Sequence, residues 1–388
     1  MKRFFSAGLA AVMIAVTVPV LRAEDGVTDK EILIGSCAAL TGPAADLGVE
    51  TVRGAKAYLD SVNAKGGVNG RKLVLNSLDD GYDPDKAIAC FKQQQDAHVF
   101  ALGFFVGTPT AVKYAPLATN AKIPLVGLFT GAEILRNPVK RYVINVRASY
   151  FNETEDQIAH LWDSLGDRKI AVLYQDDAFG AAVLAGVKQA LTKRGAAPVA
   201  LGSFARNTTD VDGGINQVKA AAPDAVVLVG AYAPLAEIVK RAKASGWNPQ
   251  FLTVSFVGTT PFIAAAGDAA EGVVITQVVP PPSRADLPTV GLYRKLIAKA
   301  GGTPSFTSLE GFVDAMVLVE GLKRAGKSPT RDGLIDAIET IKDFDMGLGA
   351  QLKATYATDD HQAFNRVYDT VVKKGEAVVF TDWKALNK

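Results

Sequence analysis

Two short turns carry the residues best suited to hold a small anion. Gly107-Thr108-Pro109 and Thr130-Gly131 each follow a short apolar run, at 99–105 and 123–128, that is typical of a buried strand. Thr108 suits a helix N-cap and Pro109 the first helical position, so we expect a helix to begin there. Free N–H groups at a helix start, together with two hydroxyls, favour a carboxylate without any Arg or Lys.

The position of these turns adds to the argument, since each alone would be an ordinary strand-to-helix connection. An amphipathic stretch joins the two apolar runs, which predicts a strand-helix-strand unit with both turns at the carboxyl ends of parallel strands. Small ligands bind at that edge in open α/β sheets. Two such turns in adjacent units therefore favour a binding site, and Glu133 adds a carboxylate to the second turn.

Catalytic, metal and nucleotide motifs are poorly represented. His98, His160 and His361 are far apart and are not spaced as metal ligands or as catalytic bases. Residues 321–328 (GLKRAGKS) fit the phosphate-loop pattern, but that mechanism needs a strand before the loop and a helix after it. Here a helical pattern precedes and Pro329 follows, so we interpret Gly326 as a helix C-cap. We expect no enzymatic activity, no metal and no cofactor.

Strands and helices alternate regularly along the chain and would position the two turns. Strands are predicted at 31–38, 72–78, 99–105, 123–128 and 142–146, and then at 169–174, 199–204 and 225–229, with short strands near 251 and 273. Helices are predicted at 48–65, 152–165, 179–194 and 234–245, with another starting at Pro84. This alternation predicts an α/β fold with parallel sheets covered on both faces, and its restart after residue 146 predicts two similar lobes.

The last third of the chain has a different pattern. Three prolines at 280–282 form a stiff connector. Helices are then predicted at 287–299, 309–324 and 330–341, and a hairpin at 366–380. A helical block without strands must pack on an earlier sheet, so we expect at least one lobe to be discontinuous in sequence.

The amino terminus and the charge balance indicate an exported protein. Lys2 and Arg3 precede an apolar run, and cleavage after Ala23 is plausible, so residues 1–23 are predicted to be a signal peptide. No Cys follows the run to carry a lipid anchor, and we expect a periplasmic location. The whole chain has a formal net charge of +2, and removing three basic residues leaves −1, which gives no electrostatic footprint for nucleic acid.

Cys37 and Cys90 are the two cysteines of the sequence. Cys37 falls in the first predicted strand and Cys90 in a predicted helix, and the compartment would be oxidising. Whether they pair depends on a distance that the sequence does not give. We expect buried free thiols rather than a bridge.

Several motifs, taken as a set and in order, identify a family resemblance. They are LTGPAADLG (40–48), NAKGGVNGRKL (63–73), DDGYDPDKA (79–87), the VGTPT and FTGAE turns, NVRAS (145–149) and GDAAEGV (267–273). With these, the chain resembles the solute receptors of bacterial branched-chain amino acid ABC importers, the type I periplasmic binding proteins. The resemblance covers essentially the whole chain after residue 23.

The resemblance implies two doubly wound lobes joined by three crossovers, near 146–149, 276–279 and 357–364. Lobe 1 would comprise 24–146 plus 279–357, and lobe 2 would comprise 147–278 plus 358–388. It further implies a monomeric receptor that binds a small solute between closing lobes and delivers it to an ABC permease. The contact residues carried over are Gly107, Thr108, Thr130 and Gly131 for a carboxylate, Leu47 for the apolar part, and Phe179 and Tyr232 as second-lobe aromatics.

One position departs from the family pattern. Where amino acid receptors present a Glu to the ligand's ammonium, this chain has Ser255. Burying an ammonium without an anion costs about several kcal/mol. Either Glu133 or Asp177 takes that role, in which case a hydrophobic amino acid is the ligand, or the ligand is an aromatic or keto acid without an ammonium. The second carboxylate in the matching turn favours an amino acid slightly.

The remaining alternatives concern individual residues and the class of protein. Arg147 and Tyr150, beside the first crossover, are expected to fix the hinge rather than to contact ligand. Glu310 is either a cleft residue or a first-turn acid that stabilises its helix. A secreted two-lobed α/β enzyme remains a competing hypothesis, but it would need a nucleophile and base that the sequence does not show.

Overall fold

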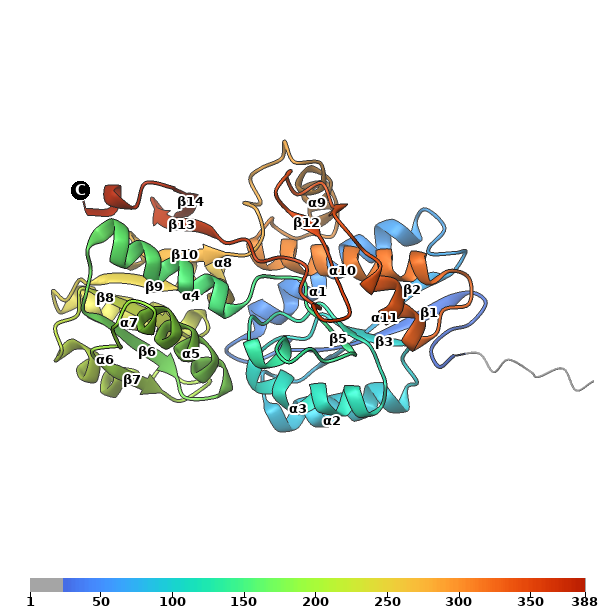
Figure 1. Cartoon of the computed structure of the whole chain (residues 1–388), viewed down its shortest axis with the longest axis horizontal. Helices are drawn as coiled ribbons and strands as arrows, with labels where there is room; N and C mark the ends of the chain where they lie inside the picture. The colour runs from blue at the N-terminus through green and yellow to red at the C-terminus, as the bar shows by residue number, and fades with distance from the viewer. Residues whose placement is uncertain (1–23, 388) are drawn as a thin grey trace, which may run out of the picture.

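The structure is a computed structural model that describes residues 24–387 (Figure 1). The predicted signal peptide, residues 1–23, lies outside the described residues. Two sheets, each covered by helices on both faces, form two lobes, and the predicted α/β class with two doubly wound lobes is confirmed. Across residues 24–387, none of the helices is both long and apolar enough to cross a membrane.

Lobe 1 is built on a parallel five-stranded sheet in the order β2-β1-β3-β4-β5. Its strands are β1 (Glu31–Ala38), β2 (Lys72–Asp79), β3 (Ala101–Gly103), β4 (Leu125–Val126) and β5 (Val143–Ile144). Its helices are α1 (Ala45–Asn63), α2 (Pro84–Asp96), α3 (Thr108–Asn120), α9 (Pro288–Lys299), α10 (Phe306–Ala325) and α11 (Arg331–Glu339). The late helices α9 and α10 pack on α1, and α11 packs on α10, as expected for a lobe that is discontinuous in sequence.

Lobe 2 is built on a seven-stranded sheet in the order β14-β13-β10-β9-β8-β6-β7. Its strands are β6 (Ile170–Gln175), β7 (Leu201–Phe204), β8 (Ala225–Val229), β9 (Gln250–Thr253), β10 (Val274–Gln277), β13 (Tyr368–Lys373) and β14 (Glu376–Val379). Its helices are α4 (Tyr150–Ala159), α5 (Ala178–Thr192), α6 (Asp212–Lys219), α7 (Tyr232–Ala244) and α8 (Thr259–Ala266). The predicted hairpin is confirmed, because β13 and β14 pair antiparallel and extend the parallel part of the sheet.

Some predicted elements differ from those observed. The predicted strands at 99–105 and 123–128 are only three and two residues long, because Phe104 and Gly127 take positive φ values of 64° and 67° and turn the chain away from the sheet. The late block is not purely helical, since β11 (Phe344–Asp345) pairs with β12 (Lys353–Ala354). A π-helix (His160–Leu165) continues α4, so the predicted helix at 152–165 has two parts.

The apolar core is continuous from one lobe to the other. One cluster lies between α1, α9, α10, α11 and the first sheet, and another lies between α6, α7, α8 and the second sheet. The third cluster includes Leu102 and Leu125 of lobe 1 together with Val172 and Val227 of lobe 2. It runs from the α2/α3 face of the first sheet to the α4/α5 face of the second, so the lobes are in apolar contact at the edge where the two turns lie.

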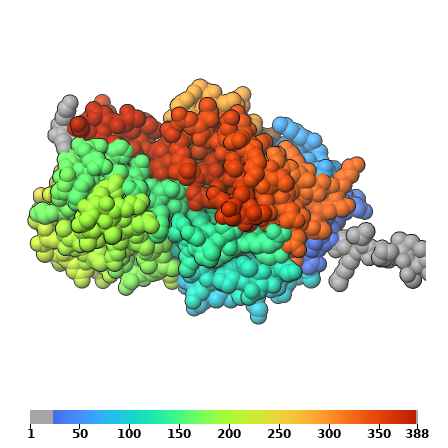
Figure 2. All heavy atoms as spheres, viewed as in Figure 1, coloured from blue at the N-terminus to red at the C-terminus, as the bar shows by residue number. Residues whose placement is uncertain are grey.

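Chain segments that link the lobes lie side by side. Asn145 N–H donates to the carbonyl of His361 (2.8 Å), and Phe364 N–H donates to the carbonyl of Val146 (3.0 Å). The C-terminal residues run across one face of the molecule from the first lobe to the second, as Figure 2 shows in red. Two of the expected crossovers, near 146 and 361, are therefore hydrogen-bonded to each other.

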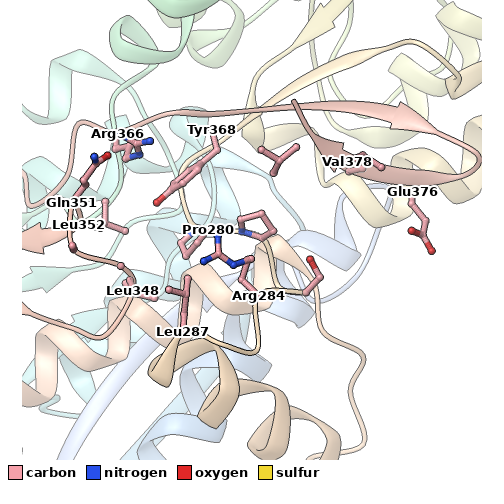
Figure 3. A pocket seen from close by; sticks show the side chains of 16 residues that line it. Pro280, Arg284, Leu287, Leu348, Gln351, Leu352, Arg366, Tyr368, Glu376 and Val378 are labelled. Carbon is pink, nitrogen blue, oxygen red and sulfur yellow. The ribbon is translucent and has the colours of Figure 1, made fainter. Parts of the chain in front are cut away.

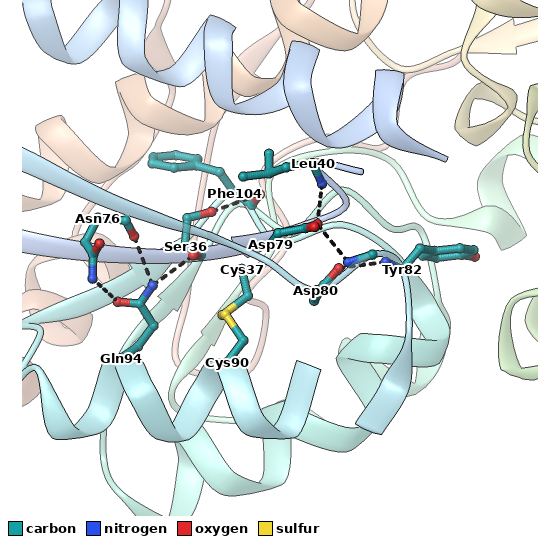
Figure 4. The surroundings of a disulfide bond; sticks show 11 residues. Ser36, Cys37, Leu40, Asn76, Asp79, Asp80, Tyr82, Cys90, Gln94 and Phe104 are labelled. Carbon is teal, nitrogen blue, oxygen red and sulfur yellow. Dashed lines mark hydrogen bonds between the residues drawn. A yellow bond between two sulfur atoms is a disulfide. The ribbon is translucent and has the colours of Figure 1, made fainter. Parts of the chain in front are cut away.

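The expectation of free thiols is wrong, because Cys37 and Cys90 form a disulfide with their Cα atoms 6.1 Å apart (Figure 4). Cys37 lies on β1, and Cys90 lies on the buried face of α2 beside Phe91. Asp83 caps the start of α2, since its side chain accepts from the N–H groups of Asp85 and Lys86. The separation of 53 residues gave no indication of this proximity.

Candidate functional site

The first turn begins α3 in a different way from the sequence prediction. Gly107, with φ 101°, is the N-cap residue and Thr108 is the first helical residue, so the predicted capping role of Thr108 is wrong. A Cβ at Gly107 would collide with the ring of Tyr82, which makes this position specific for glycine. No side chain caps α3, so the first N–H groups of the helix receive no capping bond at the positive end of its dipole.

The hydroxyl of Thr108 does not cap α3 and instead contacts the second turn. Thr108 Oγ1 and Thr130 Oγ1 lie 2.6 Å apart, and Thr130 Oγ1 lies 3.5 Å from the hydroxyl of Tyr150. Gly131 brings the chain against Tyr150, because a Cβ there would overlap its ring and backbone. The two predicted turns thus form one polar patch, and Thr108 is only 1% exposed.

Aromatic rings from both lobes pack around this patch. Phe256 of lobe 2 lies 5.5 Å from Phe129 and 6.0 Å from Tyr82, both of lobe 1, measured between ring centroids. Phe179, at the start of α5, lies 4.5 Å from Phe256 and 5.4 Å from Tyr150. The predicted role of Phe179 as a second-lobe aromatic is consistent with this geometry, and Phe256 and Tyr82 are ring neighbours that the sequence did not single out.

Leu47 and Tyr232 meet on the other side of the cleft. Leu47 belongs to α1 in lobe 1 and is fully buried. It packs against Gly258 of lobe 2, where a Cβ would overlap its side chain and lie 3.6 Å from the Tyr232 ring. Burial raises the pKa of Tyr232, whose hydroxyl lies at the backbone of Asp46. These two predicted contact residues are therefore brought together across the lobes.

A buried arginine contacts Ser255, the residue at the position where the family pattern has a ligand-facing acid. Arg147 is 1% exposed, and its Nη2 donates to Glu153 Oε1 (2.8 Å) and contacts Ser255 Oγ. Its Nη1 donates to Glu310 Oε1 (3.2 Å). Burial alone would lower the pKa of Arg147, but the adjacent carboxylates of Glu310 and Glu153 raise it above its usual value. Arg147 therefore joins lobe 2 to α10 of lobe 1, in agreement with a hinge role.

The guanidinium also lies near the aromatic rings of the site. Its central carbon is 5.4 Å from the centroid of Phe129 and 5.6 Å from that of Tyr150, within the range of cation–π attraction. Phe129 precedes Thr130 directly, so Arg147 lies close behind the hydroxyl patch. Tyr150, for which we predicted hinge packing, is fully buried and reaches the patch through its hydroxyl.

A second buried arginine lies next to the first. Arg136 donates to the carbonyls of Thr130 (3.1 Å) and Ala132 (3.0 Å) and so fixes the second turn. Burial lowers the pKa of Arg136 to about 10. Burial raises the pKa of Glu310 to about 7 and raises the pKa of Asp314 well above its usual range. Glu310 lies beyond the first turn of α10 and is bonded to Arg147, so it is not a first-turn acid.

The two acids considered for a ligand ammonium have other neighbours in the structure. Glu133 begins a short 3-10 helix and lines a groove with Asn152, His361 and Gln362, which lies on the hinge side of the molecule. Asp177 is the N-cap of α5, where it accepts from the N–H groups of Phe179 and Gly180. Glu133 therefore lies in the hinge-side groove after the extended Ala132, and its role as a ligand contact stays a prediction.

Other motifs fall outside this site. Gly326, with φ 81°, ends α10, and Asn69 and Arg71 bond to the carbonyls of Gly326 and Lys327, so the C-cap interpretation of the phosphate-loop pattern is confirmed. His160, predicted to stand apart from other ligands, lies with Asp156 and Asp369 so that their ligating atoms are within 4.8 Å of one another. Asp156 and Asp369 come from α4 and β13, which no sequence spacing could reveal.

A groove of about 680 Å³ lies between the proline connector and the C-terminal hairpin (Figure 3). Pro280, Leu287, Leu348 and Tyr368 are among its lining residues. None of the residues predicted to contact ligand lines it. The groove is therefore separate from the hydroxyl patch.

Comparison with known sequences identifies the family. The profile of a family described as periplasmic binding protein matches residues 31–377 of this chain. The chain belongs to the periplasmic binding proteins. This periplasmic binding protein is similar to the Leu/Ile/Val-binding protein homolog 3 of Brucella melitensis biotype 1, with 24% identity over 324 residues that cover 82% of this chain and 86% of that protein.

Solved structures agree with the family assignment. The crystal structure of a possible leucine/isoleucine/valine-binding protein from Rhodopirellula baltica SH 1 has a TM-score of 0.88 and 34% identity, covering 95% of this chain and 100% of that one. A fatty acid ABC transporter substrate-binding protein from Thermomonospora curvata has a TM-score of 0.82 and 25% identity, covering 92% and 93%. The resemblance inferred from the motifs is confirmed.

Three residues of this periplasmic binding protein, Tyr82, Phe256 and Glu153, were not predicted as part of the site, and only the first two could have been found from the sequence. Tyr82 lies within the DDGYDPDKA motif and Phe256 follows Ser255, so both adjoin positions that had been noted. Glu153 lies in the helix after the first crossover and gave no signal, because its importance comes from contacts with Arg147, Ser255 and Thr276. Aromatic residues next to the turns indicate the rings from the sequence, but no local pattern indicates the ion cluster.

Proposed function

We propose that this periplasmic binding protein captures a small carboxylate-bearing solute with an apolar body between its two lobes and delivers it to an ABC permease of the inner membrane. The observation that carries the proposal is the hydroxyl pair of Thr108 and Thr130, 2.6 Å apart at the carboxyl ends of β3 and β4, with the hydroxyl of Tyr150 3.5 Å from Thr130 Oγ1. Relatives named for leucine, isoleucine and valine, and one named for fatty acids, support this class of solute.

The site can supply the required affinity. A micromolar receptor needs about 8 kcal/mol of net binding free energy. Each hydrogen bond to a charged carboxylate contributes about 1.5–3 kcal/mol, and burying a Leu-sized group adds about 1.5–3 kcal/mol. Gly107, Thr108, Thr130 and Gly131 would hold the carboxylate, while Leu47, Phe179 and Tyr232 would enclose the body. Ligand stabilises the closed arrangement because it contacts both lobes.

The proposal includes the lobe boundaries and the cellular context. Lobe 1 comprises 24–146 plus 279–357 and lobe 2 comprises 147–278 plus 358–388, with the hinge at the three crossovers. Residues 1–23 direct export to the periplasm, and the mature protein acts as a monomer that docks on its permease with both lobes.

A ligand screen tests this function. A thermal-shift screen over amino acids, 2-oxo acids, aromatic acids and fatty acids should raise the melting temperature for one class, because a ligand that binds only the folded state stabilises it by linkage. Calorimetric titration should then give one site per chain. Uptake of the same ligand into permease-containing vesicles should depend on the binding protein. Absence of binding by any carboxylate, or turnover of the ligand, would contradict the proposal.

A further inference from the structure

We infer that the captured carboxylate carries no ammonium group, so that the ligand is an organic acid with an apolar body rather than an amino acid. The inference rests on the proposed function and concerns the same site. It follows from the way in which the acidic groups around the hydroxyl patch are already bonded within the protein.

Both carboxylate oxygens of Glu153 already accept hydrogen bonds from the protein. Its Oε1 accepts from Arg147 Nη2 (2.8 Å) and Ser255 Oγ (3.0 Å). Its Oε2 accepts from Ser255 N (2.8 Å) and Thr276 Oγ1 (2.7 Å). The side chain is 0% exposed, so both oxygens are surrounded by donors of the protein itself. A ligand ammonium would have to displace one of these four bonds.

Ser255 also directs its donor groups toward Glu153. Its N–H and hydroxyl both face Glu153, and its hydroxyl also contacts Arg147. The position at which a ligand-facing acid was expected therefore supplies two donors and adjoins a guanidinium. An ammonium finds no acceptor there, and it meets a cation instead.

Three other acids are bonded or placed elsewhere. Glu310 accepts from Arg147 Nη1, and Asp177 accepts from two helix N–H groups and from Gln175 Nε2 (2.6 Å). Glu133 lines the hinge-side groove. Asp314 keeps one buried oxygen, Oδ2, without a partner among the described residues, but burial raises its pKa and so favours its neutral form. An ammonium beside Ser255 would thus lose its water without gaining a free carboxylate there, which is costly in a medium of low dielectric constant.

The charge balance of the buried cluster favours an anion. Arg136 and Arg147 are two buried cations within one cluster, joined through the bond from Arg136 Nη2 to the Arg147 carbonyl (3.3 Å). Burial raises the pKa of Glu310 to about 7 and that of Asp314 well above its usual range, which favours the neutral form of both acids. The two guanidinium groups attract a carboxylate and repel an ammonium.

The walls of the site suit an apolar body without further polar groups. Phe129, Phe179 and Phe256 present ring surfaces from both lobes, with centroids 4.5 to 5.5 Å apart along the series. Tyr150 adds a ring whose hydroxyl already serves the threonine pair. A flat arene or a branched alkyl group attached to the carboxylate would pack on these rings.

Matched ligand pairs test the inference on the unmodified mature protein. The pairs are phenylpyruvate with phenylalanine and 4-methyl-2-oxopentanoate with leucine, which share a body and a carboxylate and differ in the ammonium. Benzoate and 3-phenylpropanoate test whether the oxo group is needed. We expect at least tenfold tighter binding, by calorimetric titration, for the member of each pair that lacks the ammonium.

The outcomes separate this inference from the function on which it rests. Equal or tighter binding of the amino acids would overturn the inference and leave the proposed function standing. Failure of every carboxylate to bind would overturn both. Thr130→Ala serves as the control, because it should weaken both members of a pair by the same factor. A loss confined to the amino acid would show that this patch recognises the ammonium, and would also overturn the inference.

Discussion

Thr108 and Thr130 each contribute a hydroxyl that the sequence placed in separate turns and that the structure brings within hydrogen-bonding distance. Thr108→Ala and Thr130→Ala should each weaken ligand binding at least tenfold, since a hydrogen bond to a charged group contributes about 1.5–3 kcal/mol. Calorimetric titration against the ligand found in the screen measures the change.

The matched control for this prediction lies on the same helix. Thr119, near the far end of α3, donates to the carbonyl of Ala115 and is remote from the patch. Thr119→Ala should leave affinity unchanged. The free energy of unfolding of the two site variants should fall by no more than about 1 kcal/mol, the usual net value of one neutral hydrogen bond. Unchanged affinity in both site variants would remove the hydroxyl patch from the binding site.

Asp80 makes stability depend on pH. Its Oδ1 accepts from Tyr82 N–H (2.9 Å), its Oδ2 is buried without a partner within the described chain, and burial raises its pKa to about 7. In the unfolded chain an Asp titrates near pH 3.9. Between about pH 4 and pH 7 the folded chain therefore keeps a proton that the unfolded chain has released, so the free energy of unfolding falls as the pH rises through this window.

The variant Asp80→Asn tests this dependence. It keeps the acceptor for Tyr82 N–H and cannot ionise, so at pH 8 it should be more stable than the parent protein by up to roughly 4 kcal/mol, taking about 1.4 kcal/mol per pKa unit. The difference should vanish near pH 4. Asp83→Asn should instead be less stable than the parent protein at pH 8, because hydrogen bonds from Lys86 and Asp85 lower the pKa of that N-cap carboxylate. Urea denaturation at several pH values measures the free energy of unfolding of both variants. If Asp80→Asn showed the same pH dependence of stability as the parent protein, Asp80 would not be the group that titrates.

At the scale of elements, the disulfide fixes α2 to β1 behind the first turn. It closes a separation of 53 residues, for which chain entropy predicts about 4 kcal/mol of stabilisation. The double variant Cys37→Ala/Cys90→Ala should therefore lose roughly 2–4 kcal/mol of unfolding free energy, as is usual for removal of a native disulfide. Reductant should destabilise the parent protein and leave the double variant unaffected. Free thiols found in the unfolded, unreduced protein would contradict the bridge.

The sequence predicted the elements better than their ends and their contacts. The strands at 31–38 and 225–229 were predicted with their observed bounds, since long β-branched and apolar runs report burial directly. The strands before the two turns were overestimated because positive φ at Phe104 and Gly127 is decided by packing. The same reason explains the ion cluster, because Arg147, Glu153 and Glu310 meet only after both lobes and α10 have assembled.

The candidate site was predictable where its residues lie in local motifs. Gly107, Thr108, Thr130 and Gly131 could be found because a turn after a buried strand has a short sequence signature. The position of Glu133 could not, since one extended residue, Ala132, redirects the chain toward the hinge. The bridge between Cys37 and Cys90 also depends on how α2 lies over the sheet, which is a property of the packed lobe.

At the scale of the whole molecule, a few side chains join the lobes across the cleft. Gln175 of lobe 2 donates to the hydroxyl of Tyr82 of lobe 1 (3.2 Å), and Phe256 packs on Tyr82 and Phe129. Because these contacts join the two lobes, we expect them to be lost when the lobes open. The balance between the open and closed forms therefore depends directly on them.

Phe256→Ala tests this coupling between closure and binding. Each aromatic pair contributes about 0.5–1.5 kcal/mol beyond its buried area, so losing the two pairs across the cleft should shift the equilibrium toward the open form by about tenfold or more. Small-angle scattering should show a larger radius of gyration, and the ligand should bind correspondingly more weakly. Phe251→Ala is the control, because that ring packs edge-on against Trp247 within lobe 2. It should lower the melting temperature without changing the radius of gyration, and an equal effect of both variants would show that Phe256 stabilises its own lobe rather than closure.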